Sequence, residues 1–225
     1  MSDLAWKRLD REIDDLAKAD AFGAFELRSY LAARRGRFDE AEQFFLKALS
    51  GTDSRLRTVM RFLIVLQAAG LGTKIRDTVV QYRGLIRNDL SAIGTASQML
   101  IQIGSSDLAL DLLREAPRLS GSSEGAFDKT VEQLESGPMP NGEEITRAVE
   151  FIRNYVRARG SKIEAMQVSS LPFEDGRKVQ YYQFRIDEQP EAVADLEWDL
   201  FGALGDVNLP SLRAGEVVFA LACGE

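Results

Sequence analysis

The chain has 225 residues, of which 45% are hydrophobic and 28% charged, and this ordinary globular composition excludes a disordered or collagen-like polymer. Its 28 Lys and Arg residues against 35 Asp and Glu residues leave a net charge of −7, opposite in sign to a surface that binds nucleic acid. We therefore expect no nucleic-acid partner, and we expect no membrane partner because no apolar run approaches the length of a bilayer span.

Along the first 135 residues, apolar side chains recur at spacings of three and four, which is typical of amphipathic helices. Loop signals at 50–53 and 88–89 separate helical pairs and offer Ser, Asn or Asp residues as N-caps. The predicted helices cover about residues 3–18, 22–35, 38–49, 54–69, 74–87, 90–103, 106–116 and 123–135.

Three glycines recur at a fixed interval in this segment. Gly36, Gly70 and Gly104 are each 34 residues apart, and each ends one predicted helix and precedes another. Glycine tolerates the left-handed backbone conformation that ends a helix. The interval also keeps apolar residues in register at Ala32, Leu66 and Leu100 before the glycines and at Phe45, Val79 and Leu113 after them. We infer a helical-hairpin repeat with a period of 34 residues.

Residues 31–49 alternate small and aromatic side chains at Gly36, Phe38, Ala41, Phe45 and Ala48. This pattern resembles the second half of a tetratricopeptide repeat, where small residues let helices approach and a large residue fills the gap to the next hairpin. The resemblance covers about residues 20–120 and implies an α-solenoid that binds other proteins.

The later hairpins keep the pattern to different degrees. The third has Gly104, Ala109, Leu113 and Ala116, with Ser106 where an aromatic residue is usual. The second departs further, because Ile75 and Tyr82 occupy positions where the family has small residues.

By the same resemblance, a partner-binding groove is lined by the first helix of each hairpin. The corresponding residues are Glu26, Tyr30, Arg34, Arg57, Met60, Ile64, Gln67, Gln98, Ile101 and Gln102. The Lys and Asn set with which some family members hold a C-terminal carboxylate is missing. Three apolar members of the set instead suggest a groove that takes a helix or an extended peptide, or that the chain's own second domain closes.

Residues 136–142 break every regular pattern and contain two of the six prolines, so they predict a boundary between domains 1–136 and 143–225. The charge changes there. From Pro138 onward there are 9 basic and 15 acidic residues, a net charge of −6, against 19 basic and 20 acidic residues before it. Nearly all the acidity therefore belongs to the second domain.

The second domain is predicted to be a small α-β-β-α-β unit, which makes the whole chain α+β. Asn141 followed by Glu144 is the spacing of a capping box at the start of an amphipathic helix. Two strands at 162–170 and 178–186 form a hairpin with a turn at Asp175-Gly176. After a helix from 190 to about 204, residues 215–223 are apolar on both sides, which favours an inner strand; we expect both helices on one face of the sheet.

Seven acidic residues and no basic one lie between Asp187 and Asp206. The plainest interpretation is a solvated helix face. The alternatives are a surface that docks a basic partner, and a metal site or a paired-carboxylate catalytic site. Asp195 and Asp199 share a face away from the apolar stripe, and Trp198 lies among them. Trp198 is either an interface anchor or packs under the linker or on the repeats.

The helix before the hairpin ends in Arg153, Arg157 and Arg159, followed by Lys162. Cations at a helix C-terminus are favourable on dipole grounds alone. We prefer that interpretation to a phosphate or nucleic-acid contact, because the domain is net acidic.

The chain has no histidine, which removes Ser-His-Asp and Cys-His catalysis and histidine-based zinc sites. Residues 70–74 are too short for a phosphate-binding loop, and the lone cysteine, Cys223, fits a core position in a reduced, cytoplasmic protein. We expect no catalytic residue, no metal and no cofactor.

The leading hypothesis is an adaptor or chaperone-like scaffold that binds a protein or peptide partner in the groove, with the acidic domain as a second contact surface. The alternative is a small enzyme or ligand sensor with a pocket converging on Asp187, Glu188 or Tyr182. Homo-oligomerisation is compatible with both.

Overall fold

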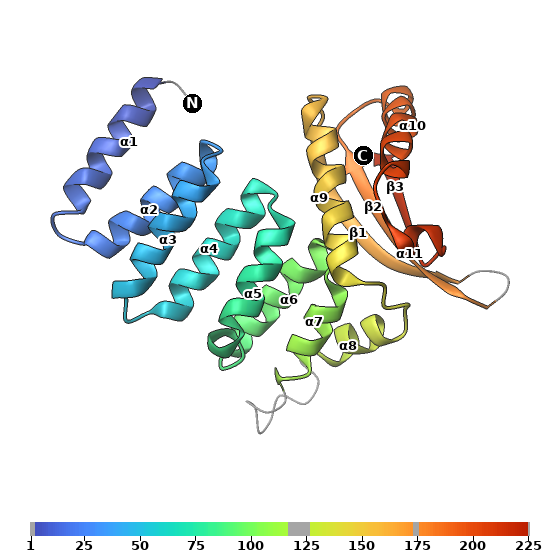
Figure 1. The fold of residues 1–225 in the computed structure, drawn as a ribbon, viewed down its shortest axis with the longest axis horizontal. Coiled ribbons are helices and arrows are strands. Elements are labelled where there is room, and N and C mark those ends of the chain that lie inside the picture. Colours follow the sequence, from blue (N-terminus) through green and yellow to red (C-terminus); the bar gives the residue numbers. More distant parts are fainter. Residues whose placement is uncertain (1–2, 117–126, 173–175, 225) are drawn as a thin grey trace. The chain divides into compact units, whose positions relative to one another are not determined.

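The computed structural model describes residues 3–116, 127–172 and 176–224, and Figure 1 shows its α+β architecture, in which a run of helices precedes a small sheet near the C-terminus. The described elements are α1 (Asp3–Leu16), α2 (Ala21–Arg34), α3 (Phe38–Gly51), α4 (Arg55–Ala69), α5 (Gly72–Ile86), α6 (Leu90–Gln102), α7 (Ser106–Leu113), α8 (Asp128–Glu135), α9 (Gly142–Ala158), β1 (Ile163–Pro172), β2 (Lys178–Ile186), α10 (Pro190–Gly205), α11 (Pro210–Arg213) and β3 (Val217–Cys223). None of these helices is long and apolar enough to cross a membrane.

The chain divides into two compact units. The N-terminal unit comprises Met1–Leu71 and Thr78–Ile86, and the C-terminal unit comprises Gly72–Asp77 and Arg87–Glu225, so α5 contributes to both. The predicted boundary at 136–142 falls inside the C-terminal unit, and the expectation that 1–136 and 143–225 are separate domains stays a prediction.

The predicted helices and strands are confirmed with ends that differ by a few residues, and one short helix, α11, was not expected. Residues 123–126 of the helix predicted at 123–135 lie outside the described residues, and α8 begins at Asp128. Asp175 of the predicted hairpin turn also lies outside them, while Gly176 has the left-handed φ of 81°.

The 34-residue register is confirmed by backbone geometry and burial. Gly36, Gly70 and Gly104 have φ values of 74°, 75° and 82°. Every register position on either side of them is buried: Ala32, Leu66, Leu100, Phe45, Val79 and Leu113. Equivalent residues of successive hairpins therefore occupy equivalent places in the helical packing.

Aromatic stacking joins hairpins within the N-terminal unit. The Phe45 ring of α3 lies parallel to the Phe62 ring of α4, with 4.0 Å between centroids, and meets the Tyr82 ring edge-on at 5.8 Å. Tyr82 stands where the repeat pattern has a small residue, and α5 departs from helical φ and ψ at this residue. The large ring thus coincides with a kink in the helix.

The C-terminal unit contains a three-stranded sheet in the order β1-β2-β3, with β1 antiparallel and β3 parallel to β2. Tyr182, Phe184 and Ile186 alternate along one face of β2, and the buried stripes of α9 and α10 pack in the same core as these residues. The two helices therefore cover one face, as predicted.

The expectation that the last strand is an inner strand is wrong, because β2 is central and β3 is an edge strand. Val217, Phe219 and Leu221 face the helices and are buried. Ala220 and Ala222 lie on the opposite face and stay half-buried. The apolar character of both sides of β3 thus reflects small residues on an open face rather than burial on two faces.

Only the Asn141 half of the predicted capping box forms at the N-terminus of α9. The Asn141 side chain accepts hydrogen bonds from the amides of Glu143 and Glu144. The buried Glu144 carboxylate, however, accepts from the amide of Ser211 (2.8 Å) and from its hydroxyl (3.1 Å). Glu144 thereby anchors α11 to α9 instead of completing a capping box.

A polar network fixes α9 to the helices before it. Arg76 donates to both carboxylate oxygens of Asp107 (3.1 Å each) and to Ser105 Oγ (2.7 Å). Ser105 Oγ lies 2.8 Å from Thr146 Oγ1, which donates to the carbonyl oxygen of Gly142. The start of α5, the α6–α7 turn and α9 are thus joined by hydrogen bonds between buried or half-buried groups, each worth about 1 kcal/mol.

Gly104→Ala should destabilise the protein more than Gly36→Ala. Both glycines have positive φ, so alanine costs about 1–2 kcal/mol at either position. A Cβ atom at 104 would also lie 2.4 Å from Ile145 Cγ2 of α9, whereas nothing lies within 4 Å at 36. The overlap should add about 1–3 kcal/mol.

Urea unfolding followed by circular dichroism measures both losses. Equal losses in the two variants would contradict the packing of the α6–α7 turn against α9.

Candidate functional site

Helices α2 and α4, the first helices of the first two hairpins, are neighbours in the N-terminal unit, and the Glu26 side chain connects them. Its carboxylate accepts a hydrogen bond from Thr58 and forms an ion pair with Arg61, both on α4. Glu26 is therefore occupied in holding the two helices together, although the repeat pattern predicts it in a partner-binding groove.

Tyr30 and Ile64 are the exposed apolar members of the predicted groove. They occupy the same position of successive repeats, Tyr30 four residues after Glu26 and Ile64 three residues after Arg61. Helical periodicity therefore places both on the side of the helices that carries the Glu26–Arg61 pair. Tyr30 is 42% and Ile64 52% exposed. We call this pair the first-helix stripe.

The other predicted groove residues differ in accessibility. Arg34 and Arg57 are exposed, while Met60 and Gln67 are half-buried. Gln98, Ile101 and Gln102 lie on α6 in the C-terminal unit, where Gln98 is exposed and the other two are half-buried. The carbonyl oxygen of Gln102 accepts a 3.5 Å hydrogen bond from Arg153 of α9.

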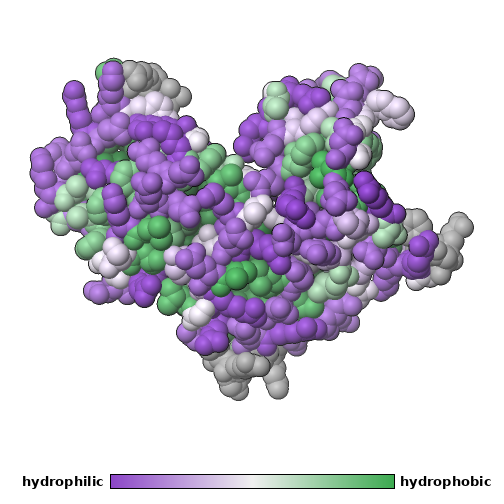
Figure 2. All heavy atoms as spheres, in the orientation of Figure 1, coloured by the Kyte–Doolittle hydropathy of each residue, from purple (hydrophilic) through white to green (hydrophobic). Residues whose placement is uncertain are grey.

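A second stripe of exposed apolar residues was not predicted. Leu46 of α3 is 48% and Val80 of α5 56% exposed, and these two residues are also 34 apart. We call Leu46 and Val80 the second-helix stripe, because they lie on the second helices of their hairpins. Their 34-residue spacing is visible in the sequence and could have predicted the stripe. Apolar atoms reach the surface among hydrophilic ones over the N-terminal helices in Figure 2.

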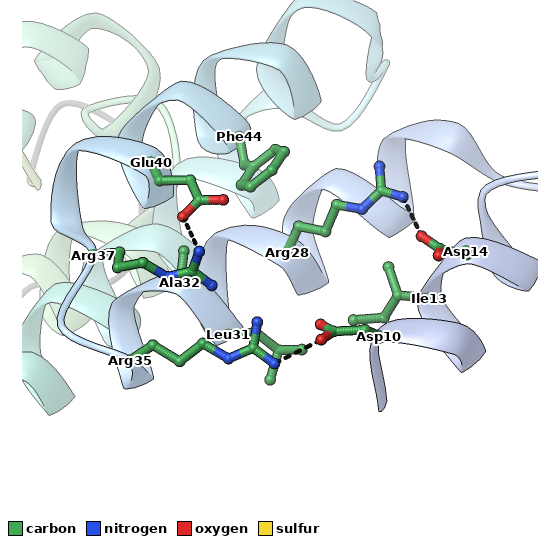
Figure 3. Close-up of a pocket in the computed structure, with 10 residues that line it drawn as sticks. All are labelled: Asp10, Ile13, Asp14, Arg28, Leu31, Ala32, Arg35, Arg37, Glu40 and Phe44. Atoms are coloured by element: carbon green, nitrogen blue, oxygen red, sulfur yellow. Dashed lines mark hydrogen bonds and ion pairs between the residues drawn. The ribbon is translucent and has the colours of Figure 1, made fainter. Parts of the chain in front are cut away.

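A cavity of about 250 Å³ in the N-terminal unit is lined by residues of α1, α2, the α2–α3 turn and α3 (Figure 3). Its arginines all face carboxylates: Arg28 with Asp14 (2.7 Å), Arg35 with Asp10 (2.9 Å) and Arg37 with Glu40 (2.8 Å). Arg35 also lies over the Trp6 ring at 4.7 Å. Because these charges balance in pairs, the cavity walls attach α1 to the first hairpin and offer no net charge to a ligand.

The predicted acidic surface lies on the outer side of α10, where Asp195 and Asp199 are exposed. Trp198 is 82% exposed, so the linker residues 137–142 of the same unit do not cover it. Phe201 beside it is also exposed. The outer face of α10 thus combines two aromatic side chains with carboxylates.

Glu197 belongs to the same acidic run in the sequence, but its carboxylate is bonded to the edge strand β3. The amides of Gln180 and Gly224 bond to Glu216 and Ile186 across the β2–β3 pair, so odd-numbered residues of β3 direct their amides to the free edge. Glu197 accepts the Leu221 amide at 2.8 Å. It therefore satisfies part of an edge that a partner strand could otherwise use.

The residues of the alternative enzymatic site do not converge. Tyr182 is enclosed in the core, where its hydroxyl donates to Gln180 Oε1 at 2.8 Å and burial raises its pKa. Asp187 and Glu188 are exposed. Among the described residues, no group of three or more acidic or cysteine side chains could hold a metal ion.

No protein-family model, no curated protein and no solved structure matches this chain in the comparisons made with each.

Glu197→Ala should lower the free energy of unfolding by about 1–2 kcal/mol, because it removes a charge-assisted hydrogen bond to Leu221. Asp199→Ala removes the same charge from an exposed position of the same helix and should change the free energy by less than about 0.5 kcal/mol. Equal effects in urea unfolding would contradict the role of Glu197 at the strand edge.

Proposed function

We propose that this chain is a non-catalytic, tetratricopeptide-like interaction protein that binds a protein or peptide partner on the α2–α4 face of its N-terminal unit. The observation that supports this most is the first-helix stripe, Tyr30 and Ile64. The neighbouring register positions are buried by helix packing, whereas these two large apolar side chains stay in water. Aromatic and aliphatic anchors of this kind dominate the energetics of protein interfaces.

The charge around the stripe defines the partner. Arg34 and Arg57 are exposed, and Arg61 is also on this face, against the single carboxylate of Glu26. Cations that surround an apolar centre favour a partner segment with an apolar side chain and nearby carboxylates, because complementary charge steers association. The groove would accept this segment as a helix or an extended peptide.

The outer face of α10 supplies the proposed second contact surface. This face combines exposed aromatic rings with carboxylates, at Asp195, Trp198, Asp199 and Phe201. An apolar side chain with nearby carboxylates is also what we infer for the partner segment. A second copy of the chain is therefore one occupant that the experiment has to distinguish from another protein.

A photo-crosslinking residue, p-benzoylphenylalanine, placed at position 64 should capture the partner in a native cytoplasmic lysate. The same residue at position 80 is the matched control, because Val80 is equally exposed and belongs to the second-helix stripe. We expect one stoichiometric cross-linked product from position 64 that is absent from position 80 and is lost when Tyr30 is changed to Ser.

The mass of the product identifies the occupant, since a multiple of 25.0 kDa signifies a second copy. Capture at position 80 alone, or equal capture at both positions, would show that the α2–α4 face is not the binding surface.

A further inference from the structure

The end of α9 and the start of β1 line a solvent-open cavity of about 320 Å³ in the C-terminal unit. It is lined by Arg153, Val156, Arg157, Ser161, Lys162 and Ile163. Three of these described lining residues are cationic and none is a carboxylate. The volume is at the lower end of the range for small-molecule sites, about 300–1,000 Å³.

The local backbone brings the three cations together. Arg153 and Arg157 are four residues apart and so lie on one face of α9, one turn from each other. Gly160, at a φ of 82°, ends the helix and reverses the chain so that Lys162 lines the same cavity. Like charges at this spacing repel, and the fold tolerates the repulsion.

Arg153 is the member of the set whose charge is least satisfied. Its Nε atom is buried with no hydrogen-bond partner in the described structure, and its Nη2 atom makes one 3.5 Å hydrogen bond, to the Gln102 carbonyl oxygen. Burial, and then the charge of Arg157, lowers the pKa of Arg153. A buried charge without a counter-ion is costly, and a buried unpaired donor in a native structure requires a reason.

The helix dipole does not supply that reason. It favours exposed cations in the last turn, which describes Arg157, whereas Arg153 lies deeper in the helix and is partly buried. The arginines of the N-terminal cavity are each paired with a carboxylate, whereas no carboxylate among the described residues pairs with Arg153.

We propose that this cavity is an anion site that holds a phosphate group, with Arg153, Arg157 and Lys162 as its cationic contacts and the Ser161 hydroxyl as a further donor. Guanidinium groups match the geometry of phosphate oxygens and donate strong charge-assisted hydrogen bonds to them. The site belongs to the C-terminal unit, and the proposal does not depend on partner binding by the N-terminal unit.

The test uses the full chain labelled with ¹⁵N and titrated at constant ionic strength with inorganic phosphate, phosphoserine and, as a negative control, serine. We expect saturable shifts of arginine side-chain Nε–Hε signals with the phosphate-bearing probes and none with serine. Phosphoserine binding more tightly than inorganic phosphate identifies a phosphate ester as the ligand; equal affinity identifies free phosphate.

Lys162→Gln should weaken binding about tenfold, the loss expected from one charge-assisted hydrogen bond. Because Lys162 is exposed, this variant should fold, whereas Arg153→Gln alters a more buried side chain. Arg159→Gln is the matched control: it removes the same charge from the same helix end, but Arg159 lies over the Tyr155 ring at 3.5 Å and does not line the cavity.

Affinity unchanged in Arg159→Gln and reduced in Lys162→Gln supports the site. The absence of saturable binding, or equal weakening in both variants, would overturn it.

Discussion

Packing one helical hairpin against the next requires the same positions to be buried every 34 residues. Within the N-terminal unit, Ala32 and Leu66, and Phe45 and Val79, meet that requirement, and Gly36 and Gly70 take the left-handed conformation that ends the first helix of each hairpin. The requirement applies only to the packed sides of the helices. The remaining sides of the helices are free to carry other side chains. Tyr30 and Ile64 lie on such a side and are exposed, so they do not contribute to hairpin packing as the buried register residues do.

The hairpins and the sheet could be predicted because their determinants are local. Helix ends depend on glycines and caps, and the β1–β2 hairpin depends on β-branched and aromatic residues on either side of a turn signal. The position of β3 could not be predicted in this way. Alanines on an open face and alanines in a buried strand look alike in sequence, and only the pairing of β3 with one neighbour distinguishes them.

The candidate sites were less predictable because tertiary contacts decide which polar groups are available. Glu26 fits a groove by its place in the repeat, yet Thr58 and Arg61 engage its carboxylate. Glu197 belongs to an acidic run, yet Leu221 engages it. The cations at the end of α9 illustrate the opposite case. The charge of −6 over residues 138–225 argued against an anion site, but charges beyond about 8 Å are screened in physiological salt. The net charge of a domain therefore does not decide the lining of a single cavity, which here includes Arg153, Arg157 and Lys162.

Adjacent valines in α5 test the register most directly. Val79 is fully buried at a register position, and Val80 is 56% exposed one residue later. The account predicts that Val79→Ala lowers the free energy of unfolding by about 1–3 kcal/mol, the loss of two buried methyl groups and the cavity that they leave. It predicts that Val80→Ala changes it by less than about 0.5 kcal/mol. A loss in Val80→Ala equal to or larger than that in Val79→Ala would contradict it.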